Sequence, residues 1–231
     1  MSTTSLPIRS LSEKAQAARE SIGEAFDKGG PAAITCSFQA EDMVVLRLAQ
    51  ELDANIPVLF LETGYHFAEM YAYRDEMTER YDLNLVNVMP KTTVPEQESQ
   101  FGILYQSQPD QCCKMRKVQP LFAALEDYDV WFTGLRRVQS PTRANLQVFD
   151  RFPLPTGKHL WKVSPLADWS DKEVWNYARE LEIPLLSLYD QGFTSIGCQP
   201  CTSLPTDAAN ARSGRWAGRK LECGIHIAEK N

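Results

Sequence analysis

The sequence predicts an α/β fold built on a doubly wound, mostly parallel sheet. In the first half of the chain, short apolar runs alternate with longer segments of helical periodicity. This alternation is typical of parallel strands joined by helices that cover both faces of a sheet. After Gly192 the periodicity fades while glycine and proline recur, so we expect a loop-rich, mobile C-terminal tail.

The first strands and helices each have a local signal. Residues 32–38 are apolar and follow Gly29-Gly30-Pro31, which indicates a buried strand. Helical patterns and further apolar runs then follow in alternation. The predicted order is strand, helix, strand, helix, strand, at residues 32–38, 41–52, 57–61, 67–81 and 84–88.

The second half of the chain predicts two more helices and three strand-like segments. Pro153, Pro155 and Gly157 separate two of the strand-like segments, which indicates a hairpin or a sheet edge. Asp168 or Ser170 could cap the last helix. The helices are expected at 113–125 and 171–182, and the strands at 130–133, 145–152 and 159–163.

Length and composition exclude several classes of protein. The 231 residues suit one domain with a short appendage, and we expect an α/β domain at 1–205 and a tail at 206–231. No apolar run approaches the roughly 18 residues of a membrane span, and the N-terminus lacks the apolar core of a signal peptide. A cytoplasmic protein without membrane contact is therefore expected.

Charge is unevenly distributed along the chain. The net charge is -6, whereas residues 206–231 hold five basic and three acidic side chains, which leaves -8 for the remainder. An acidic protein is a poor general binder of nucleic acid, since Lys and Arg supply most of the non-specific affinity for phosphates. A basic tail on an acidic body instead indicates one compact anionic ligand.

Six cysteines in a chain of cytosolic character indicate metal binding or catalysis rather than disulfides. Cys112 and Cys113 are adjacent, and Cys198 and Cys201 form a CxxC pair. Thiolates suit zinc or an iron–sulfur cluster, and adjacent thiolates are easier to place on the separate irons of a 4Fe-4S cubane than on one zinc ion. Cys36 lies in an apolar run and is expected in the core.

Cys223 stands apart from both pairs and is a candidate nucleophile. Arg219, Lys220 and His226 lie close to it in the sequence, and nearby positive charge lowers the pKa of a thiol. The neighbouring Glu222 acts in the opposite direction. An incidental surface thiol is the alternative interpretation.

Three polar segments follow predicted strands, at residues 37–42, 61–64 and 133–137. The carboxyl ends of parallel strands are where open α/β sheets bind ligands, so we expect these segments to converge. Residues 37–42 lead into a helix N-terminus that favours an anion, although they lack the Walker A pattern and an ordinary turn is equally consistent. Residues 133–143 hold three arginines, whose guanidinium groups suit phosphate or sulfate oxygens.

Together these motifs resemble those of the assimilatory adenylyl-sulfate (APS) and phosphoadenylyl-sulfate (PAPS) reductases. The resemblance extends over residues 30–226 and rests on seven motifs in the same order. They are SFQAED at 37–42, ETGYHF at 62–67, CCKMRK at 112–117, TGLRRVQSPTR at 133–143, PLADW at 165–169, CQPC at 198–201 and ECGIH at 222–226.

The resemblance implies an adenine nucleotide α-hydrolase-like fold and reduction of APS to sulfite and AMP, in assimilatory sulfate reduction for cysteine biosynthesis. It makes Cys223 the nucleophile that attacks the sulfur of APS, releases AMP and becomes an S-sulfocysteine. Thioredoxin or a similar dithiol then frees sulfite. Family analogy also implies a homo-oligomer.

The resemblance also assigns ligands to the site. Cys112, Cys113, Cys198 and Cys201 are expected to ligate one 4Fe-4S cluster per subunit, with Lys117 between cluster and substrate. PAPS reductases typically lack both cysteine pairs, so their presence favours APS. Substrate contacts are expected from Ser37, Phe38, Gln39, Glu41, Asp42, Glu62, Thr63, Gly64, Lys117, Gly134, Arg136, Arg143, Arg212 and Arg215.

Three alternatives stay open at this point. A PAPS or dual-specificity reductase is one, because the chain has Ser37-Phe38 where many members have Ser-Gly before Ala-Glu-Asp. An ATP pyrophosphatase or sulfurtransferase would need a Ser-Gly-Gly-x-Asp-Ser type of loop, which residues 37–42 lack. An iron–sulfur redox sensor would leave Cys223 and the arginine-rich tail without a role.

Overall fold

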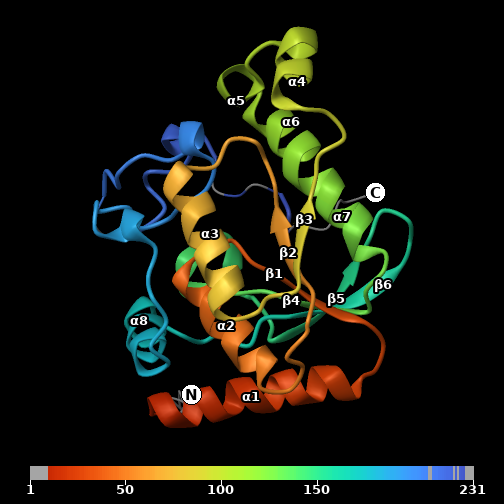
Figure 1. The fold of residues 1–231 in the computed structure, drawn as a ribbon, viewed down its shortest axis with the longest axis vertical. Helices are drawn as coiled ribbons and strands as arrows, with labels where there is room; N and C mark the ends of the chain where they lie inside the picture. Colours follow the sequence, from red (N-terminus) through yellow and green to blue (C-terminus); the bar gives the residue numbers. More distant parts are fainter. Residues whose placement is uncertain (1–9, 208–209, 221, 223, 227–231) are drawn as a thin grey trace, which may run out of the picture.

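Six strands form one sheet in the computed structural model, which describes residues 10–207, 210–220, 222 and 224–226 (Figure 1). The strand order is β3-β2-β1-β4-β6-β5, and every neighbouring pair is parallel except β5 with β6. The predicted mostly parallel sheet is therefore confirmed. The strands are β1 (Ala32–Thr35), β2 (Val58–Leu61), β3 (Leu85–Val88), β4 (Val130–Phe132), β5 (Phe149–Pro153) and β6 (His159–Val163).

Helices cover both faces of this sheet. Ile34 of β1 packs in a core with α1, α2, α3 and α8, whereas its neighbour Ala33 packs in a second core with α7, because successive strand residues point to opposite faces. Figure 1 shows α2 and α3 on one side of the strands and α7 on the other. The helices are α1 (Leu11–Asp27), α2 (Ala40–Gln50), α3 (Ala68–Arg80), α4 (Val94–Phe101), α5 (Leu104–Ser107), α6 (Pro109–Cys113), α7 (Gln119–Leu125) and α8 (Asp171–Glu180).

Helix α1 is absent from the predicted elements. A capping box begins it: the Glu13 N–H donates to Ser10 Oγ at 3.3 Å, and the Ser10 N–H donates to Glu13 Oε2 at 2.6 Å. The helix buries a narrow stripe made mostly of alanine, namely Ala15, Ala18, Ile22 and Ala25. Such small side chains give a weak periodic signal, and this explains why the sequence analysis missed the helix.

The helix expected at 113–125 is part of a longer helical segment, made of α6, a π-helical turn (Lys114–Val118) and α7. Turns of this kind are uncommon and occur frequently at functional sites. This one directly follows Cys112-Cys113 and carries Arg116 and Lys117. An irregularity in the helix therefore separates the cysteine pair from the part of the helix that packs on the sheet.

The expected hairpin is present, since β5 and β6 pair in antiparallel register and β5 forms one edge of the sheet. Ser170 caps α8, because the Glu173 N–H donates to Ser170 Oγ at 3.3 Å and the Ser170 N–H donates to Glu173 Oε2 at 2.7 Å. Asp168, the other candidate cap, forms an ion pair with Arg137 instead.

The described part of the chain after Gly192 is loop-rich, as expected. It contains short 3₁₀ turns at Gln199–Cys201 and Trp216–Gly218, and an isolated bridge joins Thr202 to Arg215. Within the residues that the structure describes, no helix has the length and apolar character needed to cross a bilayer.

Candidate active site

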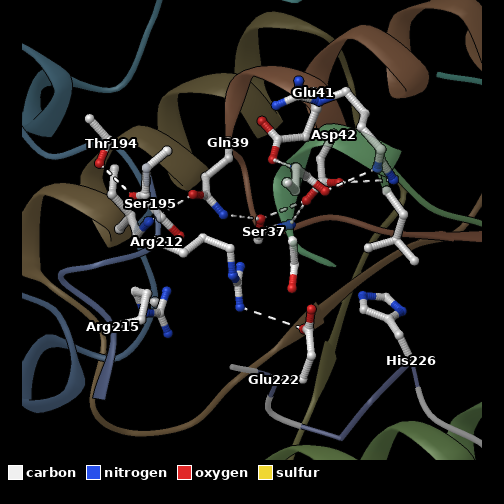
Figure 2. A pocket seen from close by; sticks show the side chains of 18 of the residues that line it. Ser37, Gln39, Glu41, Asp42, Thr194, Ser195, Arg212, Arg215, Glu222 and His226 are labelled. Carbon is white, nitrogen blue, oxygen red and sulfur yellow. Dashed lines mark hydrogen bonds and ion pairs between the residues drawn. The ribbon is translucent and has the colours of Figure 1, made fainter. Parts of the chain in front are cut away.

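A cavity of about 830 Å³ lies at the carboxyl ends of β1, β2 and β4, where open α/β sheets bind their ligands (Figure 2). Its walls come from the loop after β1, the arginine segment after β4 and the C-terminal tail. The fold thus gathers segments that are far apart in the sequence. Among the residues selected from the sequence, the lining includes Ser37, Gln39, Glu41, Asp42, Lys117, Gly134, Arg136, Arg143, Arg212 and Arg215.

Asp42 organises the loop after β1. Its carboxylate accepts hydrogen bonds from the backbone N–H and the hydroxyl of Ser37 at 2.7 and 2.6 Å, and from the N–H of Gly134 at 3.2 Å. A Cβ atom at Gly134 would overlap this carboxylate, so the close approach requires glycine. Burial and the adjacent Glu41 raise the pKa of Asp42 to about 6, although its hydrogen bonds act in the opposite direction.

Phe38 points away from the cavity and into the core. Its side chain is 1% exposed, and its ring packs against Phe60 and Tyr73 with centroid distances of 5.7 and 6.3 Å. Its φ of 58° lies in the left-handed region that favours glycine. The loop therefore has a glycine-like backbone at the position for which the resemblance noted above leads one to expect glycine, and Phe38 is not among the lining residues.

Glu62, Thr63 and Gly64 also lie outside the cavity lining. The Glu62 carboxylate accepts hydrogen bonds from the Tyr71 hydroxyl at 2.6 Å and from the Gly64 N–H at 2.7 Å. Thr63 Oγ1 accepts a hydrogen bond from the Cys198 thiol at 3.4 Å. These residues join the end of β2 to the cysteine region, and their contact with substrate stays a prediction.

The arginines of the site have different partners. Arg136 is buried, and its guanidinium donates to Asp171 at 2.6 Å and to the Trp169 carbonyl at 3.3 Å. Its side chain is thereby held against the start of α8. Arg143 instead makes a two-pronged ion pair with Glu222, with Nε to Oε1 at 2.8 Å and Nη2 to Oε2 at 2.6 Å.

Glu222 is a residue of the site that the sequence analysis did not select. Figure 2 shows it facing Arg212, whose Nη2 lies 3.5 Å from Glu222 Oε2. Burial alone would raise the pKa of Glu222, but the hydrogen bonds and charge of Arg143 and the charge of Arg212 hold it below its ordinary value. A carboxylate is thus bound where the arginines could receive the anion of a ligand. Only its acidic character beside basic residues could have indicated this from the sequence.

The last described residues of the tail pack on the sheet near the same cavity. The His226 ring stacks on the Trp131 ring with a centroid distance of 5.5 Å and an interplanar angle of 18°. Lys162 Nζ donates to the His226 carbonyl at 3.1 Å. Burial lowers the pKa of Lys162 to about 8, although Asp150 opposes the shift. Burial and the charge of Lys162 also hold the pKa of His226 well below its ordinary value.

Cys223, the predicted nucleophile, lies outside the described residues. Its described neighbours Glu222, Ile225 and His226 line the cavity. Thr194 and Ser195 line it as well, from the loop between Gly192 and Gly197, and the sequence offers only their polar character as a signal.

The four paired cysteines line a second, smaller cavity beside the first, and Lys117 and Arg215 line both. Among the described residues, no three His, Cys, Asp or Glu side chains are arranged to hold a single metal ion. A donor set of four thiols around one cavity fits a cluster with several irons, because each thiolate can reach a separate iron. The cysteines are Cys112, Cys113, Cys198 and Cys201.

The pKa shifts of these thiols reflect how closely they are grouped. Burial and the other three thiols raise the pKa of Cys112 to about 11, and burial and Cys198 likewise raise that of Cys201. Burial also acts to raise the pKa of Cys198, but the charge of Lys117 and the hydrogen bond to Thr63 leave it below its ordinary value. Cys198, which donates to Thr63, is thus the most easily ionised of these three thiols.

Comparisons with known proteins agree with this architecture. Residues 31–204 match the model of the phosphoadenosine phosphosulfate reductase domain. The chain is 41% identical over 227 residues to the adenosine 5′-phosphosulfate reductase of Mycolicibacterium smegmatis, covering 96% of this chain and 94% of the relative. It is 44% identical over 202 residues to the enzyme of the same name from Mycobacterium tuberculosis, covering 84% and 78%.

Solved structures show the same fold at lower identity. The crystal structure of phosphoadenylyl-sulfate reductase from Candida auris superposes with a TM-score of 0.70 at 23% identity, covering 87% of this chain and all (100%) of the other. A Candida glabrata FMN adenylyltransferase superposes with a TM-score of 0.64 at 17% identity, covering 88% and 70%. The fold of this chain is thus shared with both of these proteins.

Proposed function

The chain belongs to the family of the phosphoadenosine phosphosulfate reductase domain, and from that premise we propose that it reduces adenosine 5′-phosphosulfate (APS) to sulfite and AMP in assimilatory sulfate reduction. Relatives at 41% and 44% identity that carry the name adenosine 5′-phosphosulfate reductase support this activity. One observation carries it in the structure: an arginine-rich cavity at the strand ends shares Lys117 with a cavity lined by four cysteines.

Binding of the substrate uses the two sides of the larger cavity. The loop that begins at Ser37 receives the adenylyl part at the strand ends, where Asp42 holds this loop against Gly134. Arg143, Arg212 and Arg215 face the phosphosulfate, because guanidinium groups match the oxygens of both anions.

The chemistry is a nucleophilic displacement at sulfur. The Cys223 thiolate attacks the sulfur of APS, the bond between sulfur and the bridging oxygen breaks, and AMP leaves with the electron pair. Arginines of the cavity stabilise the negative charge of the departing AMP. A thiolate of thioredoxin or a similar dithiol then attacks Cys223 Sγ and releases sulfite. The second thiol of the donor resolves the mixed disulfide, so the dithiol supplies both electrons.

Cys112, Cys113, Cys198 and Cys201 would hold a 4Fe-4S cluster. When bound, this cluster would supply negative charge beside the substrate cavity. Lys117 lines both cavities, so its positive charge lies between the four thiols and the substrate. We also propose the division into a nucleotide- and cluster-binding domain at 1–205 and a tail at 206–231.

The test measures sulfite release by anaerobically purified protein with thioredoxin and either APS or PAPS, with iron and acid-labile sulfide counted in the same sample. We expect about four irons per chain and a strong preference for APS. Activity confined to PAPS would contradict the proposed substrate, and bound zinc would contradict the cluster. Iron–sulfur protein that releases no sulfite would instead favour a redox sensor.

Two variants separate the roles of the cysteines. Cys223→Ser should keep APS binding and the iron content but lose sulfite release. Cys36→Ala is the control for loss of another thiol from the same cavity, because the buried Cys36 lines the larger cavity but lies outside the cavity with the four cysteines, and this variant should keep the iron content and still release sulfite. Wild-type turnover by Cys223→Ser would contradict the assignment of the nucleophile.

A further inference from the structure

The described tail is attached to the body at two points that flank position 223. Glu222 pairs with Arg143, and His226 stacks on Trp131 and accepts a hydrogen bond from Lys162. Ile225 packs in the same apolar core as Trp131, on the α7 face of the sheet. The described residues on either side of position 223 are therefore both attached to the body of the protein.

The first attachment conflicts with substrate binding. Arg143 uses Nε and Nη2 for Glu222 and Nη1 for Gln139, which lies at 2.6 Å. Glu222 therefore occupies the edge of the guanidinium formed by Nε and Nη2, and a phosphosulfate that binds Arg143 through this edge has to replace the Glu222 carboxylate. The tail then loses this attachment at the moment when the nucleophile is needed.

The second attachment does not involve the cavity arginines. Lys162 lies in β6 directly beside Trp131 of β4, and its side chain is on the same face of the sheet. Its Nζ lies 5.4 Å from the Trp131 ring centroid and 5.2 Å from that of Phe152, and it donates to the His226 carbonyl at 3.1 Å. Lys162 is 4% exposed and is not among the residues that line the larger cavity.

A buried lysine needs a specific reason in the middle of a sheet. Removing an ammonium group from water is unfavourable unless partners compensate, and an aliphatic side chain would pack in this core without that cost. Lys162 Nζ contacts two aromatic faces and donates its hydrogen bond to one backbone oxygen of the tail. The charges of Asp150, which lies opposite Lys162 in β5, and of Glu222 also favour the ammonium form, but the hydrogen bond goes to the tail. The ammonium group is thus directed at the tail.

We propose that Lys162 is a positioning residue that holds the tail at the cavity through the His226 carbonyl, and that this attachment persists when the substrate displaces Glu222 from Arg143. The proposal rests on the proposed function, since it assumes that an anionic substrate binds the arginines and that Cys223 attacks it. Lys162 then acts on the rate of the first chemical step and not on the affinity for substrate.

The test compares Lys162→Met with the matched control Lys158→Met. Methionine keeps an unbranched apolar stem in the core and removes the donor. Lys158 lies on the same hairpin, but it contacts Glu126 and Asp129. Hydrogen exchange of the C-terminal peptide is measured without substrate, and again with APS in the Cys223→Ser background. AMP release is measured in a single turnover without a dithiol, with each protein retaining Cys223.

We expect Lys162→Met to speed exchange of the tail by about tenfold, the size of effect typical for one hydrogen bond from a charged donor, and by more when APS is bound. AMP release should slow by about tenfold or more, while the dissociation constant for APS stays within about twofold. Lys158→Met should match the wild type in each measurement. Lys162→Arg keeps a charged donor and should retain a protected tail, which separates the hydrogen bond from general packing.

Three results would overturn the proposal. If Lys162→Met has the same tail exchange and AMP release as the wild type, Lys162 does not hold the tail. Weakened APS binding with an unchanged tail would make it a substrate contact. A protected tail in Lys162→Met but not in Lys162→Arg would contradict the role of the donor. Failure of the wild type to release AMP would refute the proposed function instead, and the exchange comparison without substrate would still decide the role of Lys162.

Discussion

Replacing Phe38 by glycine and by alanine tests the backbone of the loop after β1. Phe38 has a φ of 58°, which costs an L-residue about 1–2 kcal/mol relative to the right-handed region and costs glycine almost nothing. Its ring is buried against Phe60 and Tyr73. The two substitutions remove the same ring and differ in the backbone that they tolerate.

The expected magnitudes follow from these two contributions. Loss of the buried ring should lower the free energy of unfolding by about 3–5 kcal/mol in both variants. Glycine then regains about 1–2 kcal/mol of backbone strain but loses about 0.5–1 kcal/mol more chain entropy than alanine. F38G should therefore be more stable than F38A by about 0.5–1 kcal/mol, which reverses the usual order of the two residues.

Urea unfolding of both variants, followed by tryptophan fluorescence and by circular dichroism, measures this difference. Phe60 provides the control, because it is equally buried but has no positive φ, and F60A should be more stable than F60G. A higher free energy of unfolding for F38A than for F38G would refute the left-handed conformation of this loop.

Three further predictions concern stability and binding. Because the pKa of Asp42 is raised from 3.8 to about 6 in the folded protein, its stabilisation is complete below about pH 3.8 and is lost as pH rises through 6. The loss is at most about 3 kcal/mol, and a pH series of unfolding experiments on D42N should lack it. Ser170→Ala removes the cap of α8 and should cost about 1 kcal/mol, or about 2–4 °C in melting temperature; no change would contradict the cap. Glu222→Gln removes the carboxylate that pairs with Arg143, so APS should bind several-fold more tightly in the Cys223→Ser background, and weaker binding in equilibrium dialysis would argue against displacement.

The regular part of the fold follows from its sequence pattern. The apolar runs and helical segments between Ala32 and Val88 have the expected order, and their boundaries shift by only a few residues, because buried strands flanked by Gly and Pro are strong signals. Helix α1 was missed because its buried stripe is mostly alanine. The π-helical turn was missed because its residues, taken singly, do not distinguish it from an α-helix.

The residues of the site also differ in how well the sequence predicts them. Residues proposed to act through charge or sulfur chemistry, such as Arg143 and the two cysteine pairs, can be selected from the sequence by their residue type alone. Trp131 and Lys162 look like ordinary strand residues, and only the pairing of β4 with β6 places them side by side under the tail. The direction of the Phe38 ring likewise depends on a backbone conformation that its residue type disfavours.

The π-helical turn at Lys114–Val118 also constrains the number of residues in this helix. Each residue turns an α-helix by about 100°, and Leu121 and Leu125 fix the orientation of α7 on the sheet. Deleting one residue from the turn would let the segment become a continuous α-helix and would swing the Cys112-Cys113 pair around the axis by about that angle. Evolution can therefore substitute residues within the turn, whereas deletion of a single codon there would turn the Cys112-Cys113 pair away from Cys198 and Cys201.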